Sequence, residues 1–272
     1  MLKKCVQNKN FMIGAVLLGI LVLILAVSFF YLPYDPNGMN TQQKFQLPTP
    51  AHPLGTDNFG RDILSRVMKG SQSVFLVGFS SVGIGFLFGL LFGAAAGYLG
   101  GAVDEVLMRI TDALMAFPGV ILALVIITVS GSSTLHTAAA LGVTAIPRFC
   151  RIARAGFLQI KEMDYVKAAR SRGASPLRLM ALHILPNMVS PLLVTASVGF
   201  AGAVLSEAGL SYLGLGIQPP EPSWGMMLFE AQAYLLSSPW YAFIPGCLIT
   251  MMVLGFNLLG DGLRDVTDAR TA

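Results

Sequence analysis

Long apolar segments alternate with shorter polar stretches along the whole chain of 272 residues. Six of these segments are long enough, at about 1.5 Å per helical residue, to span roughly 30 Å of hydrocarbon. They cover residues 11–32, 74–99, 113–130, 135–157, 187–207 and 241–260. The pattern predicts an all-α polytopic membrane protein with about six transmembrane helices.

The same pattern divides the chain into three regions. An N-terminal segment with the first transmembrane helix covers residues 1–32, an extracytoplasmic loop covers 33–73, and a core domain covers 74–272. Near the end of the loop, apolar residues at helical spacing alternate with charged ones, which predicts a short amphipathic helix at the outer interface. These apolar residues are Ile63, Leu64, Val67 and Met68. The core domain contains a polar loop at 158–186.

Composition supports a membrane location for almost the whole chain. Apolar residues make up 54% of the sequence and charged residues 12%, about half the charged share of a soluble domain. The net charge of +4 follows from Lys and Arg in the regions that we place inside, so it does not indicate nucleic-acid binding. This bias predicts cytoplasmic N- and C-termini. The first apolar run lacks a clear small-residue cleavage site, so we expect it to remain as a transmembrane helix.

The stretch from Lys161 to Pro186 is the most basic part of the chain. Its cations are Lys161, Lys167, Arg170, Arg172 and Arg178. Membrane proteins concentrate Lys and Arg on the cytoplasmic side, so this stretch is predicted to face the cytoplasm. Two interpretations stay open on these residues alone: a docking surface for a partner protein, or a basic loop held against lipid headgroups.

Local signals predict a defined structure within this basic stretch. Residues 163–171 contain good helix formers, and Gly173 can end a helix in the left-handed conformation. Ser175 followed by Pro176 is typical of an N-cap and a first helical position. We therefore expect two short helices joined at Gly173, with small side chains that allow another surface to approach closely.

Two positions inside apolar segments are candidates for a pathway or a gate. Pro118 should kink the third segment, and such a kink either lines a pathway or only shapes the bundle. Glu207 lies about twenty residues after Pro186, which places it near the outer interface. It either borders a translocation path or is simply hydrated there.

The last outside segment, residues 209–227, combines glycines with a proline-rich turn and an aromatic side chain. Such a segment suits a re-entrant cap or a contact surface for an outside partner. The candidate contact residues are Tyr212, Pro220 and Trp224.

Motifs for catalysis and nucleotide binding are missing from the sequence. It contains no G-x-x-x-x-G-K-[ST] loop, no H-E-x-x-H and no G-x-S-x-G. The three cysteines (Cys5, Cys150 and Cys247) show no spacing typical of a disulfide framework or a zinc site. We therefore expect neither an enzyme nor a metal site, which leaves a transporter subunit, a channel or a membrane scaffold.

The basic stretch resembles the cytoplasmic signature E-A-A-x3-G-x9-I-x-L-P of the membrane-spanning subunits of binding-protein-dependent ABC importers. Ala168, Ala169, Gly173 and the pair Leu185-Pro186 match it at the expected spacing. Two positions depart from the pattern, with Lys167 in place of the Glu and His183 in place of the first Ile. The first departure reverses a charge, so an ion pair made by that Glu is not expected here.

Three further stretches narrow the resemblance to the C-type permease subunit of the dipeptide/oligopeptide/nickel importer family. They are residues 54–66, 211–225 and 256–265. The resemblance implies a type I ABC importer transmembrane fold in a bacterial or archaeal plasma (inner) membrane. It also implies a homologous B-type permease, two ATPase subunits and an extracytoplasmic substrate-binding protein as partners, besides membrane lipid and without nucleic acid. ATP and Mg would be bound by the ATPase subunits, and this chain would bind no cofactor.

Roles for individual residues follow from the same resemblance. A cytoplasmic coupling helix would contact an ATPase subunit through Tyr165, Lys167, Ala168, Ala169, Gly173, Ala174 and Ser175. The substrate would be di- or oligopeptides, with nickel or a metal-chelator complex as the alternative. A stand-alone channel or scaffold, whose basic loop contacts only lipid, is the competing interpretation.

Overall fold

The computed structural model describes residues 7–267, and their regular structure is helical apart from an isolated bridge between Thr56 and Asp62. The α-helices are α2 (Lys9–Ser28), α3 (Ile63–Leu99), α4 (Gly101–Met115), α5 (Gly119–Ser130), α6 (Thr134–Ile160), α7 (Asp164–Ser171), α8 (Pro176–Arg178), α9 (Val189–Tyr212), α10 (Trp224–Gln232) and α11 (Pro239–Thr267). A 3₁₀ turn covers Thr41–Gln43, and π- and 3₁₀-helical stretches at Leu179–Ile184 and Leu185–Met188 join α8 to α9. The all-α prediction is confirmed.

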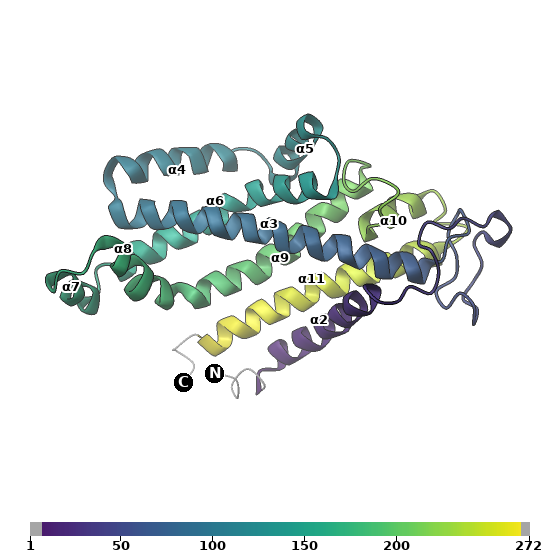
Figure 1. Cartoon of the computed structure of the whole chain (residues 1–272), viewed down its shortest axis with the longest axis horizontal. Helices are drawn as coiled ribbons and strands as arrows, with labels where there is room; N and C mark the ends of the chain where they lie inside the picture. The colour runs from purple at the N-terminus through teal and green to yellow at the C-terminus, as the bar shows by residue number, and fades with distance from the viewer. Residues whose placement is uncertain (1–6, 268–272) are drawn as a thin grey trace.

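The long helices run roughly along one axis of the molecule. Figure 1 shows α3 and α6 side by side, with α9, α11 and α2 on one side of this pair and α4 on the other. Helix α7 lies at one extreme end of the molecule, whereas α10 and the loop of residues 29–62 lie at the opposite end. The chain therefore presents two separate polar ends joined by an apolar bundle.

Four helical stretches of residues 7–267 are long and apolar enough to cross a membrane: α2, α3, α11 and the stretch Pro176–Tyr212, which ends with α9. A fifth crossing results if α4 and α5, bent by 88°, form one span. Helix α6, with 27 residues, is not apolar enough to be among them, although it lies side by side with α3 in the bundle (Figure 1). The multi-pass prediction is confirmed: length and composition alone qualify four or five stretches of the described residues, and α6, which lies along α3, is a further long helix of the bundle.

The predicted interfacial helix is not a separate element. Helix α3 begins at Ile63 and continues without interruption to Leu99. Asp62 caps its first turn by accepting a hydrogen bond from the Ser65 backbone N–H at 2.8 Å. Ile63 and Val67 are buried against the bundle. The prediction of a separate helix was wrong because Ile63 and Val67 pack into the bundle and Arg66 is paired with Glu230, so this turn is the buried start of α3.

Helix α3 packs against α6 through glycines on one of its faces. A Cβ atom at Gly85 would lie 2.7 Å from the Cβ of Ala145, and one at Gly97 would lie 2.7 Å from the carbonyl oxygen of Arg154. The glycines permit a close approach between helices in lipid, where water provides no hydrophobic force. The glycine-rich sequence of this segment therefore serves helix packing.

We expect Gly85→Val to destabilise the bundle by about 1–3 kcal/mol, because the new methyl groups overlap Ala145 and Phe149 of α6. The readout is the temperature at which the detergent-solubilised chain loses its monodisperse gel-filtration peak. Gly83→Val is the matched control, since a Cβ at Gly83 has no heavy atom within 4 Å. Equal effects of the two substitutions would contradict the packing role.

Pro118 breaks the third apolar segment completely. Helix α4 ends at Met115 and α5 begins at Gly119, with Pro118 as the residue before its first turn. The two helices meet at 88°. The structure thus has a sharp turn where the sequence predicted a kink within one continuous helix, because the residue before a proline disfavours helical geometry.

Candidate functional site

The basic segment of residues 161–186, here the protruding segment, contains a structured turn. Helix α7 ends with the Gly173 N–H donating to the Arg170 carbonyl at 2.9 Å and the Ala174 N–H donating to the Ala169 carbonyl at 3.2 Å. Gly173 has a φ of +83°, in the left-handed region. This pair of hydrogen bonds is the Schellman motif, in which a glycine ends a helix. The predicted stop at Gly173 is confirmed.

The predicted start of the second helix is also confirmed, but that helix is not short. The Ser175 hydroxyl accepts from the Arg178 N–H at 3.4 Å, and Pro176 occupies the first helical position. From there the chain stays helical through π- and 3₁₀-helical stretches into α9. The protruding segment is therefore joined to one continuous helical stretch of 37 residues, Pro176–Tyr212.

Buried side chains fix the protruding segment to the end of the bundle. Val166, Leu179 and Ile184 are each at most 1% exposed and pack with Phe157 and Met188. Because these apolar groups interlock on both sides of the Gly173 turn, α7 and the start of the next helix form one body.

Polar contacts add to this attachment. The Tyr165 hydroxyl donates to the His183 carbonyl at 3.2 Å and accepts from the Asn187 side-chain amide at 3.1 Å. The Lys161 ammonium donates to the carbonyl of Gly97, at the end of α3, at 2.7 Å. Backbone and side chains thus hold the protruding segment at a fixed angle to α3 and α9.

The predicted coupling residues divide into an exposed set and a buried set. The exposed ones are Tyr165, Lys167, Ala168, Gly173 and Ser175, Ala174 is half-buried, and Ala169 is buried. Lys167 lies 3.3 Å from Glu162 in an exposed ion pair. Ala169 therefore packs inward, while its neighbour Ala168 is available to a partner.

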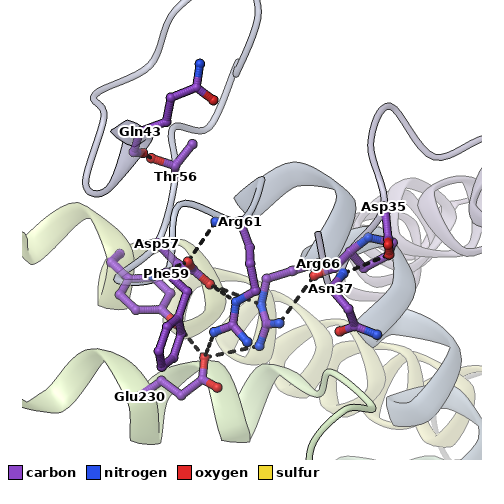
Figure 2. Close-up of polar contacts among 11 residues, drawn as sticks. Asp35, Asn37, Gln43, Thr56, Asp57, Phe59, Arg61, Arg66 and Glu230 are labelled. Carbon is purple, nitrogen blue, oxygen red and sulfur yellow. Dashed lines mark hydrogen bonds and ion pairs between the residues drawn. The ribbon is translucent and has the colours of Figure 1, made fainter. Parts of the chain in front are cut away.

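At the opposite end of the molecule, five polar side chains form a buried cluster that we call the outer network: Asp57, Arg61, Arg66, Glu230 and Tyr241. Figure 2 shows the guanidinium groups of Arg61 and Arg66 converging on Glu230 of α10. Their Nη2 atoms lie 2.6 Å and 3.1 Å from Glu230 Oε2, and Tyr241 donates to the same oxygen at 2.7 Å. Asp57 lies 2.5 Å from Arg61 Nε and 3.6 Å from Arg66 Nε.

Charge balance explains how this cluster tolerates burial. Two guanidinium groups face two carboxylates. Each of these four charged side chains is at most 11% exposed. Burial alone would lower the pKa of the Arg61 guanidinium, but the carboxylates of Asp57 and Glu230 raise it above its ordinary value. The outer network therefore ties the outer loop to α3, α10 and α11 as one neutral unit.

Sequence reasoning missed the outer network. Arg61 and Arg66 looked like the polar face of an interfacial helix, and their partner Glu230 is 169 and 164 positions away along the chain. The available signal was Asp57 four residues before Arg61, the spacing of a local ion pair.

The predicted contact residues of the last outside segment do not form one surface. Trp224 is fully buried, and its indole N–H donates to the Val67 carbonyl at 3.0 Å. Tyr212 and Pro220 are exposed. The contact prediction for Trp224 was wrong, because the indole anchors the start of α10 to α3.

Glu207 is enclosed by protein, so of the two alternatives for this residue the structure contradicts simple hydration at the outer interface. The residue is 1% exposed, and its Oε1 atom accepts from the Ser211 hydroxyl at 2.7 Å. Its second oxygen has no hydrogen-bond partner among the described residues. In residues 7–267, no group of three or more His, Cys, Asp or Glu side chains could hold a metal ion.

A family model described as the binding-protein-dependent transport system inner membrane component matches residues 89–272. A putative peptide transport system permease protein of Brucella abortus is 42% identical, covering 98% of this chain and 90% of the relative. The dipeptide transport system permease protein DppC of Haemophilus influenzae is 37% identical, covering 97% and 92%. The glutathione transport system permease protein GsiD of Pectobacterium atrosepticum is 40% identical, covering 94% and 87%.

A solved structure supports the fold. A chain of the MetNI methionine ABC transporter, in an inward-facing conformation, superposes with a TM-score of 0.61 at 20% identity, covering 73% of this chain and 95% of that one. This likeness shows the type I ABC importer transmembrane fold. With the family match and the relatives' identities, it assigns the chain: it belongs to the family of binding-protein-dependent transport system inner membrane components, as a multi-pass membrane permease.

Proposed function

We propose that this chain is the C-type permease subunit of an ATP-driven importer and forms half of a translocation pathway for di- and oligopeptides. A homologous B-type permease would supply the other half. The observation that carries the proposal is the protruding segment. Its sequence resembles the cytoplasmic signature of these permeases, and it forms two helices joined at Gly173, as expected of a coupling helix. The relatives, named as peptide, dipeptide and glutathione permeases, support the substrate class.

Mechanical continuity supports a coupling role for the protruding segment. In the proposed complex, α7 and the Gly173 turn dock in a groove on an ATPase subunit. The stretch Pro176–Tyr212 has 37 residues and would be roughly 55 Å long as an ideal helix. Closure of the ATPases on ATP would move the docked end, and this helical stretch would carry the displacement to the outer half of the bundle. ATP and Mg would be bound by the ATPase subunits, and this chain would supply no catalytic group.

In this proposal the two polar ends of the molecule lie on opposite sides of the membrane. The end with α7 faces the cytoplasm because it carries the basic segment. In Figure 1 the first residues of α2 and the last residues of α11 lie toward the same side of the molecule as α7, which supports cytoplasmic N- and C-termini. The end with α10 and the outer network then faces an extracytoplasmic substrate-binding protein.

Affinity purification of the tagged chain from its native host in mild detergent tests the assembly. We expect a second permease and one or two ATPase chains to co-purify with it, and a binding protein to join when the complex is cross-linked. Recovery of the chain alone or as a homo-oligomer would contradict the proposal and favour a stand-alone channel.

A further inference from the structure

The exposed side of the Gly173 turn contains a polar hollow of about 310 Å³. It is lined by Ala169, Arg172, Gly173, Ala174, Arg178 and His183. Three of these six residues have no side-chain atom beyond Cβ, so they leave room between the two arginines and the histidine. The hollow therefore combines open space with cationic groups.

The two arginines of the hollow lack acidic partners. Within residues 7–267, no carboxylate oxygen lies within 4.0 Å of a guanidinium nitrogen of Arg172 or Arg178. Among the residues that the structure describes, Arg172 Nε donates only to the Ala168 carbonyl, at 3.4 Å. Both residues are exposed. Their charges are available to another molecule.

The other cations of the protruding segment are already engaged. Lys161 donates to the Gly97 carbonyl, Lys167 pairs with Glu162, and Arg170 lies over the Tyr98 ring at 5.9 Å. Lys167 stands where the resembled signature has a Glu, so that position carries a cation paired within its own chain. Among the described residues, the cations of this surface without a partner outside their own helix are therefore Arg172 and Arg178, and both line the hollow.

We propose that the ATPase subunit inserts an acidic side chain into this hollow, where the carboxylate is held between Arg172 and Arg178. This inference rests on the proposed function, because it names the chemistry of the docking contact. A guanidinium offers parallel N–H donors that match the two oxygens of a carboxylate. The small floor residues let the carboxylate approach without displacing a side chain. In this contact the permease thus supplies the positive charges and the ATPase subunit the negative one, the reverse of a contact made by a Glu on the permease.

The test uses the intact permease pair immobilised in detergent and titrated with its purified ATPase subunits. Replacing both cations, Arg172→Glu with Arg178→Glu, should weaken binding by about tenfold or more, since like charges then face each other. Binding by the unchanged chain should weaken between low salt and roughly 0.5 M NaCl, while the double variant should lose most of this dependence.

The matched control is Lys9→Glu with Lys44→Glu, which makes the same charge change of four units at two exposed cations outside the protruding segment. It should alter binding by less than about threefold. An Asp→Arg or Glu→Arg substitution at one position of the ATPase docking surface should restore binding to the double variant. Gel filtration and retention of the second permease confirm that each variant is folded.

Each outcome bears on a different claim. Equal binding by the double variant and the unchanged chain would overturn the hollow as a carboxylate site, as would an equal or larger loss from the Lys9→Glu, Lys44→Glu control than from the double variant. If the unchanged permease pair binds no ATPase subunit at all, the proposed function itself fails.

Discussion

Glu230→Leu is expected to destabilise the outer end of the protein by about 3–5 kcal/mol. The substitution leaves Arg61 and Arg66 buried with only Asp57 to balance two positive charges. An uncompensated buried charge costs far more than the contact itself contributes. We expect the midpoint of thermal unfolding in detergent to fall by roughly 10 °C or more, with lower recovery of the chain from membranes.

Two comparisons isolate the charge effect. Glu221→Leu removes an exposed acid of the same outer region that forms no ion pair within residues 7–267, so its midpoint should stay close to that of the unchanged chain. Combining Glu230→Leu with Arg61→Met removes one charge of each sign and should recover part of the lost stability. A midpoint for Glu230→Leu equal to that of Glu221→Leu would show that the outer network does not stabilise the fold.

Ala168→Trp is expected to reduce ATP-driven uptake to less than about a tenth, equivalent to at least 1.4 kcal/mol of lost docking free energy. Ala168 is exposed on α7, so an indole there prevents close approach of the ATPase without disturbing the interior. Uptake by whole cells, normalised to the amount of chain in the membrane, provides the measurement. Unchanged uptake at equal membrane levels would count against docking at α7.

The neighbouring positions separate docking from folding. Ala169 is buried, so Ala169→Trp should reduce the amount of folded chain in addition to uptake. Gly173 has a positive φ, which Asn adopts more readily than a β-branched residue. Gly173→Asn should therefore retain more folded chain than Gly173→Val. A common loss of protein in all these variants, Ala168→Trp included, would indicate a purely structural role for the segment.

The protruding segment was predictable because its signals are local. Gly173 ends α7, and Ser175 with Pro176 begins the next helical stretch, within four positions of one another. Such turns depend on the conformational preferences of the residues themselves. The continuation of that stretch into α9 was not predictable, because π- and 3₁₀-helical geometry leaves no clear sequence signal here.

The outer end was predicted poorly because its contacts are long-range. The charges of Arg61 and Arg66 suggested an interface, and only the folded chain brings Glu230 onto them. Trp224 looked available to a partner, yet its indole N–H finds a carbonyl of α3, 157 positions away. Glu207 was placed at the outer interface by counting residues, which gives depth along a helix but not which neighbours cover it.

ATP-driven uptake of a labelled dipeptide into proteoliposomes tests the central claim most directly. The vesicles would contain this permease, its permease partner and the ATPase subunits, with the binding protein outside and ATP inside. The account predicts accumulation that requires both ATP and the binding protein, is lost in Ala168→Trp, and is unaffected by excess nickel. Flux without ATP would contradict the importer assignment, and uptake of nickel instead of the dipeptide would contradict the substrate class.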